Sequence, residues 1–406
     1  MRLMSETYVI VGGGHAGGRA AETLRTEGFA GRIVVVGREP VRPYMRPMLS
    51  KEYLRGDQSM DEGFLKPEGW YEEHGIELKP GCEAIKLSPH AAEIRLDSGE
   101  RLRYDKLLLT TGALPRKLEL PGEDLPGVYH LRTIADSDVL RAELRKGRRI
   151  VVIGAGWIGA EVAASARQKG CHVTLVGHST YPVAHALGNQ IGKVFKGLHE
   201  AHGVELVRGK VKGFAGSGTL EAVKLASKQI PCDAAVVAVG VTPEVSLAMD
   251  AGLDCPNGIP TNQFFQTALP NVFAAGDVAA VDHPFYGRPV RVEHWNNAQR
   301  QGALAARNLL GQRRAYTKLP YFFSDQYDVG IEYVGQHQDG DELVLRGDPA
   351  SHQFTGFWHR DGQVAAGIVM NGAGPKMDLI EALIKSDRKV DPALLADPDR
   401  PVASLL

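Results

Sequence analysis

The chain has 406 residues and a formal net charge of −1, from 47 basic and 48 acidic side chains. A chain of this length is too long for a single hydrophobic core, so we expect two or three domains. The balanced charge gives no indication of nucleic-acid binding. No apolar run approaches the roughly 20 residues that span a bilayer, and no signal peptide precedes the first apolar strand. We therefore expect a cytoplasmic protein with no membrane partner.

The cysteines argue against two kinds of site. All four are widely spaced, and none forms a Cys-x-x-Cys pair. The sequence therefore predicts neither a metal site nor a redox-active dithiol, and each thiol is expected to be a small buried side chain. They are Cys82, Cys171, Cys232 and Cys255.

An apolar strand at residues 8–11 runs directly into a glycine-rich turn and a helix of small residues. In a Gly-x-Gly-x-x-Gly turn the first glycine makes the bend, the second lets a pyrophosphate approach the backbone, and the third lets the helix pack against the strand. This turn predicts a dinucleotide site. Its residues are Gly12, Gly14, His15, Ala16 and Gly17.

A second apolar strand, residues 31–37, completes a β-α-β unit. An acidic residue at the end of this strand usually binds the ribose hydroxyls. Glu39 is the candidate, whereas Arg38 stands where the acid is expected and could instead pack on the adenine or its phosphate. Further on, Ser50 is the expected N-cap of a short helix. Lys51 beside it is either solvated or buried with a partner, because an unpaired buried charge is costly.

The middle of the first half contains short strands, with a hairpin expected around Asp97–Gly99. Thr111 and Gly112 end the last strand at a crossing between domains, and a linker rich in proline and glycine follows at residues 120–127. Arg132, just after this linker, could reach a cofactor or lie on the surface. A charged, apolar-spaced helix is expected at residues 136–146.

A second copy of the glycine motif begins about 140 residues after the first, again between an apolar strand and a small-residue helix. Two such turns in one chain predict two bound dinucleotides. The residues of the second turn and the start of its helix are Gly154, Gly156, Ile158, Gly159 and Glu161.

The strand after the second motif ends in Gly177, where an NADH-specific enzyme usually has a carboxylate. Without that carboxylate nothing repels a 2′-phosphate. The next residues, His178, Ser179 and Thr180, could donate hydrogen bonds to such a phosphate. A permissive pocket that still uses NADH is equally compatible with the sequence, so the choice between NADH and NADPH stays open.

Two later features fit the same scheme. A strand ending at Gly240 resembles the earlier crossing and is expected to return the chain to the first domain. A buried strand then ends on Gly276 and Asp277 at an expected helix start. The Asp277 carboxylate could bind a sugar-like hydroxyl chain or could simply cap that helix.

Together with Arg46–Lys51, Val290–Trp295 and Phe323–Tyr327, these motifs resemble those of the FAD-dependent ferredoxin reductases. This is the putidaredoxin reductase and biphenyl dioxygenase reductase type, related to rubredoxin reductase and apoptosis-inducing factor. The likeness covers about residues 6–370. Three departures are Met48 for a usual proline, Arg38 for an acid at the FAD ribose, and Gly177 for an acid at the NAD ribose.

The resemblance implies an α/β fold with two Rossmann-like dinucleotide-binding domains, as in glutathione reductase, and a C-terminal α+β interface domain. It places the FAD-binding domain at residues 1–113 and 245–320, the NAD(P)-binding domain at 114–244 and the interface domain at 321–406. It also implies that Lys51 and Glu161 pair beside the flavin and the nicotinamide and hold them in register. The cofactor-binding residues expected in all are Gly12, Gly14, His15, Ala16, Gly17, Arg38, Glu39, Lys51, Thr111, Gly112, Arg132, Gly154, Gly156, Ile158, Gly159, Glu161, His178, Gly240, Gly276, Asp277, Glu293, His294 and Trp295.

The implied activity is hydride transfer from NADH or NADPH to FAD, followed by single-electron transfer to a [2Fe-2S] ferredoxin that feeds an oxygenase. Such partners are usually acidic, so a basic docking face is expected. An ordinary solvated helix face explains the same residues equally well. The candidates are Arg300, Arg307, Arg313, Arg314 and Lys318. The enzyme is expected to be a monomer or a homodimer.

Two alternatives remain. An NADH oxidase, peroxidase or CoA-disulfide reductase would need a redox cysteine near the first β-α-β unit, where this chain has Met45, Met48 and Ser50. A redox-switched interaction protein, like apoptosis-inducing factor, would be reduced slowly, and the sequence does not report that rate.

Overall fold

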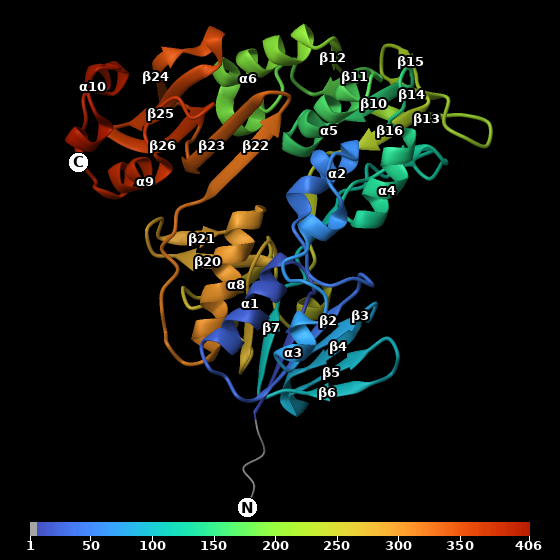
Figure 1. Cartoon of the computed structure of the whole chain (residues 1–406), viewed down its shortest axis with the longest axis vertical. Helices are drawn as coiled ribbons and strands as arrows, with labels where there is room; N and C mark the ends of the chain where they lie inside the picture. The colour runs from blue at the N-terminus through green and yellow to red at the C-terminus, as the bar shows by residue number, and fades with distance from the viewer. Residues whose placement is uncertain (1–5) are drawn as a thin grey trace, which may run out of the picture. The chain divides into compact units, whose positions relative to one another are not determined.

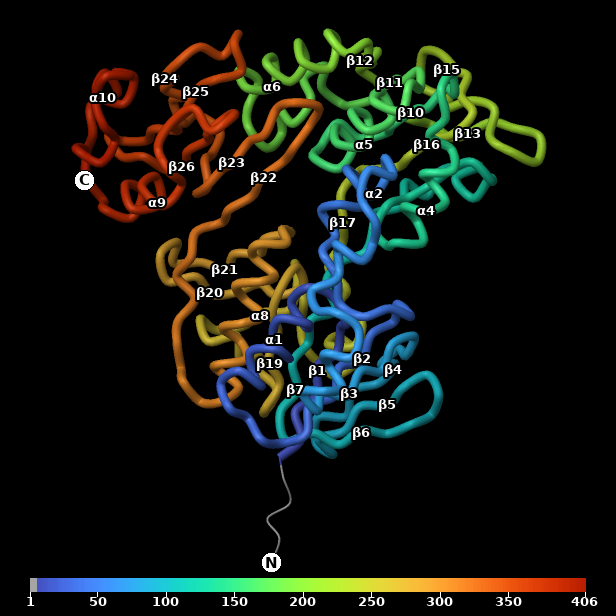
Figure 2. The backbone as a smooth tube through the Cα atoms, viewed as in Figure 1, coloured from blue at the N-terminus to red at the C-terminus, as the bar shows by residue number. Residues whose placement is uncertain are grey.

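The computed structural model describes residues 6–406 and divides them into two compact units. The first unit holds residues 6–47, Ser59–Leu114 and Val241–Lys318, and the second holds Met48–Gln58, Pro115–Gly240 and Leu319–Leu406. Figure 2 traces the chain through these boundaries. Residues 1–5, which bear on the expected absence of a signal peptide, lie outside the described part.

The first unit is built on a parallel five-stranded sheet in the order β19-β7-β1-β2-β3. Its strands read as near-continuous apolar runs, which is typical of a parallel sheet buried on both faces, except for the edge strand at Ile76–Pro80, where apolar and charged residues alternate. Helices α1 (His15–Thr26) and α8 (Trp295–Leu309) lie side by side on one face of the sheet (Figures 1 and 2). The strands are β1 (Thr7–Val11), β2 (Arg32–Gly37), β3 (Ile76–Pro80), β7 (Lys106–Leu109) and β19 (Val272–Ala274).

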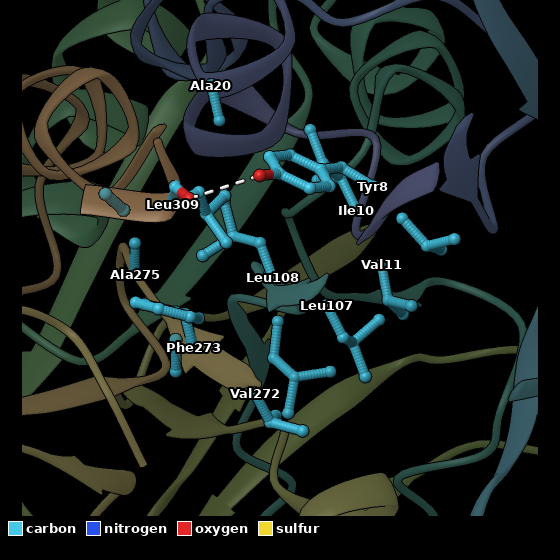
Figure 3. Close-up of a cluster of buried hydrophobic side chains, with 14 of the residues drawn as sticks. Tyr8, Ile10, Val11, Ala20, Leu107, Leu108, Val272, Phe273, Ala275 and Leu309 are labelled. Atoms are coloured by element: carbon cyan, nitrogen blue, oxygen red, sulfur yellow. Dashed lines mark hydrogen bonds between the residues drawn. The ribbon is translucent and has the colours of Figure 1, made fainter. Parts of the chain in front are cut away.

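The core of this unit covers both faces of the sheet, and these two helices cover one of them. Figure 3 shows Ile10, Leu108 and Phe273 on one face and Leu107 and Val272 on the other, with the Tyr8 hydroxyl donating to the carbonyl of Leu309 at 3.3 Å. That bond ties the first strand to the last turn of α8, although 301 residues separate the two positions.

Smaller elements complete the first unit. The hairpin expected around Asp97–Gly99 is present between two antiparallel strands. These elements are η2 (Met60–Gly63), α3 (Trp70–Glu73), β4 (Ala84–Ser88), η3 (Pro89–Ala91), β5 (Glu93–Leu96), β6 (Arg101–Arg103), β8 (Ala113–Pro115), β17 (Val241–Pro243), α7 (Ser246–Asp250), β18 (Ile259–Thr261), β20 (Ala279–His283) and β21 (Arg288–Val290).

The second unit contains another parallel sheet, in the order β12-β11-β10-β16-β9, and repeats the strand-turn-helix arrangement of the first. The helix expected at residues 136–146 is α4 (Ile134–Glu143). The sheet's strands are β9 (Val128–Tyr129), β10 (Arg149–Ile153), β11 (His172–Gly177), β12 (Val204–Arg208) and β16 (Ala234–Val237), and its other elements are η1 (Arg46–Ser50), α2 (Glu52–Arg55), α5 (Trp157–Gln168), α6 (Ala184–Ala201), β13 (Val211–Ala215), β14 (Ala222–Leu225) and β15 (Gln229–Pro231).

The C-terminal part of this unit is an antiparallel five-stranded sheet in the order β22-β23-β26-β25-β24. Apolar residues of α5 and α6 pack against it in one buried cluster that includes Phe195, Phe354 and Trp358. Its elements are β22 (Tyr321–Gln326), β23 (Val329–Gly335), β24 (Glu342–Asp348), η4 (Pro349–Ser351), β25 (Gln353–Arg360), β26 (Gln363–Met370), α9 (Met377–Lys385), α10 (Pro392–Ala396) and η5 (Val402–Leu405).

Candidate functional site

The first glycine turn joins β1 to α1 and has the shape that a diphosphate needs. Gly12 has a φ of +123°, and a Cβ there would lie 2.1 Å from the carbonyl oxygen of Thr110. A Cβ on Gly17 would lie 2.0 Å from the Gly12 oxygen. At Gly14 the nearest atom is an Arg46 nitrogen at 4.0 Å. Packing therefore requires the outer two glycines, whereas the middle one borders open space at the N-terminus of α1, where anions bind.

His15 occupies the first position of α1 and is 7% exposed. Its Nε2 lies 3.2 Å from the Gln299 side-chain oxygen, and burial lowers the pKa of the imidazole. Its Nδ1 has no hydrogen-bond partner among residues 6–406, and neither has Oδ1 of Asn296 in α8. Buried polar atoms are almost always satisfied. These two atoms fit a bound polar ligand such as FAD.

The N-termini of α1 and α8 lie close together. The rings of His15 and Trp295 meet edge to face at 5.6 Å, and a Cβ on Gly302 would lie 2.3 Å from the carbonyl of Ala16. His294 caps α8 by accepting a hydrogen bond from the Asn296 amide at 3.3 Å. Glu293, just before it, accepts from Arg291 at 2.6 Å. Two positive helix ends therefore lie side by side, which favours a negatively charged ligand there.

At the end of β2 the two ribose candidates differ. Glu39 accepts hydrogen bonds at 2.5 Å from both the Tyr44 hydroxyl and the Arg46 guanidinium, so its carboxylate is fixed. Arg38 is half exposed and lies 3.4 Å from Glu83 on the surface. Arg46 was part of a motif that carried the family resemblance but was not among the predicted cofactor-binding residues, because only the folded structure shows that it holds Glu39.

The other predicted residues of this unit lie at turns. Thr111 donates to the carbonyl of Glu244 at 2.6 Å, and Gly112 has a φ of +72°. Gly276 has a φ of +84° and donates its amide to Gln301 at 2.9 Å. Asp277 is 9% exposed. The prediction that a helix starts at this residue is wrong. Strand β20 follows, because residues from Ala279 onward pair with β18 in an extended register.

The second glycine turn, between β10 and α5, repeats the geometry of the first. A Cβ on Gly154, which has a φ of +105°, would lie 2.2 Å from the carbonyl of Ala238. One on Gly159 would lie 1.8 Å from the Gly154 oxygen, whereas no atom lies within 4 Å of a Cβ built on Gly156. Ile158, in the first turn of α5, is 37% exposed beside this open space.

The residues expected to distinguish NADH from NADPH lie at the end of β11. Gly177 pairs in register with Arg208 of β12, and the Arg208 Nε donates to the carbonyl of His178 at 3.1 Å. A cationic side chain is therefore anchored where the sequence lacks an acid. The sequence signal was available, since Arg208 ends the next strand of the same sheet. Gly240, with a φ of +98°, and Arg132, whose amide donates to Asp136 at 3.0 Å, lie at other turns of this unit.

Lys51 and Glu161 come together inside the second unit. Their charged groups are 3.5 Å apart, and the residues are 5% and 6% exposed. Lys51 also lies 3.9 Å from the Asp325 carboxylate and 4.8 Å from the centre of the Phe323 ring. Burial raises the pKa of Asp325, and the Lys51 charge opposes that rise.

Two serine hydroxyls complete this cluster. Ser50 donates to one oxygen of Glu161 at 2.5 Å, and Ser324 donates to the other at 2.7 Å. The expectation that Ser50 caps a helix is therefore wrong. Ser50 ends η1. Lys51 occupies the N-cap position of α2, but its side chain makes no capping hydrogen bond to that helix. Leaving a buried carboxylate without hydrogen-bond donors costs more free energy than leaving a four-residue helix uncapped, so the Ser50 hydroxyl bonds to Glu161.

Within residues 6–406, no group of three or more His, Cys, Asp or Glu side chains is arranged to hold a metal ion. No helix in the same range is long and apolar enough to cross a membrane.

Residues 6–302 match the pyridine nucleotide-disulphide oxidoreductase model, and residues 321–406 match the reductase C-terminal model. The chain belongs to the ferredoxin reductase group of the pyridine nucleotide-disulphide oxidoreductases. It is 39% identical over 98% of both chains to a ferredoxin–NAD(+) reductase component of the anthranilate 1,2-dioxygenase system of Burkholderia cepacia. It is 32% identical to putidaredoxin reductase of Pseudomonas putida, over 99% of this chain and 97% of that one.

Solved structures of ferredoxin reductases have the same fold over the whole chain. The reductase in the covalent putidaredoxin reductase–putidaredoxin complex has a TM-score of 0.94 at 32% identity, and covers 98% of each chain. The ferredoxin reductase of the CYP199A2 system from Rhodopseudomonas palustris also has a TM-score of 0.94, at 33% identity, over 98% of this chain and 99% of that one. The predicted family, α/β fold class and oxidoreductase class are confirmed. A ferredoxin reductase of this family requires two cofactors, FAD and a nicotinamide nucleotide.

Proposed function

We propose that the chain is an NAD(P)H-dependent ferredoxin reductase that passes electrons through FAD to a [2Fe-2S] ferredoxin serving an oxygenase. The observation that carries this function is the pair of matching glycine turns, one in each unit, each with a middle glycine facing open space. One dinucleotide for each turn is the requirement of a flavoprotein that oxidises a nicotinamide nucleotide. Relatives matched along the whole chain are ferredoxin reductase components.

In this proposal FAD lies on the first turn, with residues 1–113 and 245–320 as its domain. The contacts proposed from the first unit are the turn residues Gly12, Gly14, His15, Ala16 and Gly17, the strand-end pair Arg38 and Glu39, and Thr111, Gly112, Gly276, Asp277, Glu293, His294 and Trp295. When bound, FAD would accept a hydride from the nicotinamide and deliver electrons one at a time.

NADH or NADPH lies on the second turn, in a domain of residues 114–244. The proposed contacts are Gly154, Gly156, Ile158, Gly159, Glu161, His178 and Gly240. Lys51 and Arg132 group with this second unit and are the proposed FAD contacts outside the first. Glu161 and Lys51 would orient the nicotinamide and flavin rings, since both charges are already fixed by buried partners.

Residues 321–406 form the proposed interface domain. The proposed docking face for an acidic ferredoxin is the basic run after α8, where Arg313, Arg314 and Lys318 are exposed. Arg307 contributes less to this face, because it pairs with Glu27 at 2.8 Å. A cytoplasmic location is proposed with this function, since the cytoplasm supplies the nicotinamide donor.

The decisive experiment mixes the purified flavoprotein anaerobically with NADH, and separately with NADPH, before a [2Fe-2S] ferredoxin is added. Fast flavin bleaching followed by fast ferredoxin-dependent reoxidation is the expected result. Reoxidation only by oxygen or a disulfide would favour the oxidase alternative, which needs a redox cysteine that residues 38–58 do not contain. Slow bleaching with no ferredoxin turnover would favour a redox-switched interaction protein.

A further inference from the structure

The buried carboxylate of Glu161 is the end of a longer chain of hydrogen bonds. Ser324, which donates to it, accepts a bond from Nε2 of Gln326 at 3.2 Å. The Gln326 side-chain oxygen lies 2.9 Å from Nε2 of His199, and Nδ1 of His199 lies 3.2 Å from the Tyr327 hydroxyl. We call Ser324, Gln326, His199 and Tyr327 the Glu161 relay.

Three of the four relay residues are shielded from water, and the fourth, Tyr327, is partly exposed. Ser324 and Gln326 are each 1% exposed, and His199 is fully buried. Ser324 and Gln326 are two positions apart in β22, so both side chains lie on the same face of the strand. His199 approaches them from α6. In such a setting each hydrogen bond is electrostatically stronger than in water, and an unpaired member is costly.

The donors of the relay all run in one direction. Because the Gln326 amide nitrogen donates to Ser324, its oxygen faces His199 and must accept from a protonated Nε2. Nδ1 is then the acceptor for the Tyr327 hydroxyl. Burial lowers the pKa of His199 to about 4, so the ring is neutral near pH 7. Every proton of the relay therefore points toward Glu161, which suits an ionised carboxylate.

The backbone holds the far end of the relay in place. Tyr327 lies in the two-residue loop between β22 and β23, with Gln326 paired to Val329, and its φ is +59°. A bulky residue is uncommon in this left-handed conformation. Its ring stacks on His202 at 3.7 Å with an interplanar angle of 8°. That stacking fixes the tyrosine hydroxyl beside His199.

We propose that His199, Gln326 and Tyr327 are positioning residues that fix the direction of the Ser324 proton and thereby hold the Glu161 carboxylate in place beside Lys51. Ser324 and Lys51 meet the same oxygen of Glu161, at 2.7 and 3.5 Å. If Ser324 turned its proton elsewhere, that oxygen would lose its nearer donor. This inference rests on the proposed function, because it concerns how Glu161 orients the nicotinamide.

The main variant is Gln326→Glu, which keeps the size of the side chain but replaces its donor with an acceptor. Ser324 would then donate to residue 326 instead of Glu161. We expect the limiting rate of flavin reduction by NADH to fall about tenfold, or about 1.4 kcal/mol. The NADH dissociation constant should change less than about twofold, because Gln326 is not among the residues proposed to contact the nucleotide. Reoxidation by ferredoxin should be unchanged.

Two further variants and a control make the kinetic test specific. His199→Leu removes the donor to Gln326 and should reproduce the loss, whereas His199→Gln keeps a donor and should recover most of the rate. Thr355→Val removes a buried hydrogen bond to the carbonyl of Ala373 elsewhere in the unit and should leave the rate unchanged. An equal loss in the control, or no loss in both relay variants, would overturn the proposal.

A measurement without turnover tests the relay directly. Nitrogen NMR of the histidine-labelled holoprotein should show His199 neutral at pH 6, with its proton on Nε2. A proton on Nδ1, or a charged ring at that pH, would overturn the relay. If the wild-type protein reacted with neither nucleotide, the proposed function and the relay's role would both fall. Normal wild-type reduction with unaffected variants would reject the relay alone.

Discussion

The ammonium group of Lys51 lies 3.5 Å from the carboxylate of Glu161, and both side chains are more than nine-tenths buried. Lys51 lies at the N-cap of α2 and Glu161 lies in α5, and 110 positions separate the two residues in the sequence. Breaking a buried ion pair from one side leaves an uncompensated charge, whereas replacing both partners removes the penalty.

A double-mutant cycle should therefore show strong coupling. We expect Lys51→Met alone to lower the free energy of unfolding by about 3 kcal/mol. Lys51→Met combined with Glu161→Leu should cost clearly less than the sum of the single changes. Urea unfolding of all four proteins measures the coupling. Additive effects would mean that the two charges do not stabilise each other.

The second glycine turn offers a matched pair of alanine variants. Gly156→Ala should leave the melting temperature and flavin content unchanged, since no atom lies within 4 Å of the added Cβ. It should weaken NADH binding at least about tenfold, because the methyl group would occupy the place of the pyrophosphate. Gly159→Ala should instead destabilise the protein, as its Cβ would lie 1.8 Å from the Gly154 oxygen.

The dependence of the flavin reduction rate on NADH concentration gives the dissociation constant, and thermal melts give the stability, so the two measurements separate these effects. Gly197→Ala, in α6 with open space around its Cβ, serves as the tolerated control. Unchanged nucleotide affinity in Gly156→Ala would remove the second turn from the proposed nucleotide site.

Arg208 should contribute to the choice of nucleotide. Its guanidinium is anchored beside Gly177, and arginine near this strand end can bind a 2′-phosphate. Arg208→Glu should lower kcat/KM for NADPH about tenfold or more and change the NADH value little. Steady-state kinetics with both nucleotides give the ratio. An unchanged ratio would show that Arg208 does not contact the phosphate.

His199 should make the protein less stable at acidic pH. The pKa of this imidazole is about 6.5 in the unfolded chain and is lowered to about 4 by burial in the folded one. The unfolded state therefore binds more protons between these values, and stability falls as pH drops through this window. For one such group the loss between pH 7.5 and pH 5 is about 2 kcal/mol.

The comparison of wild type with His199→Gln isolates this contribution, because glutamine does not titrate. Urea unfolding at the two pH values should show a loss that is about 2 kcal/mol larger in the wild type. Equal losses in the two proteins would mean that the pKa of His199 is the same in the folded and the unfolded chain.

Reversing charges in the basic run after α8 should change the rate of ferredoxin reduction and no other step. Arg313→Glu combined with Arg314→Glu should slow ferredoxin reduction about tenfold at low salt and flatten its salt dependence. Flavin reduction by NADH should not change. The exposed pair Arg388 and Lys389, changed to glutamate, is the control of equal charge. An identical effect from both double variants would reflect net charge and not a docking face.

The two glycine turns could be predicted from sequence because their requirements are local. A strand, a tight turn and a helix N-terminus involve consecutive residues, so the motif predicts the geometry seen at Gly12 and Gly154. The overall α/β class followed for the same reason. Where local signals competed, the prediction failed: Ser50 looked like a helix cap, and Asp277 looked like a helix start.

The contacts around Glu161 could not be predicted from local pattern, although the family resemblance implied its pairing with Lys51. Ser50, Ser324 and His199 come from separate segments, and nothing in their neighbouring residues reports that they share one buried site. Arg46 was missed in the same way, whereas Arg208 could have been found from its place at the end of the next strand of the sheet.

The sequence by itself determined the two dinucleotide turns and the strand and helix on either side of each, because short apolar strands and glycine spacing act over a few residues. The resemblance to the family came from these turns together with the Arg46–Lys51, Val290–Trp295 and Phe323–Tyr327 segments. Tertiary structure alone decided which polar side chains satisfy the buried Glu161 carboxylate and which way their protons point. That outcome depends on β22, α5 and α6 packing together, since burial is what makes an unpaired charge too costly to leave.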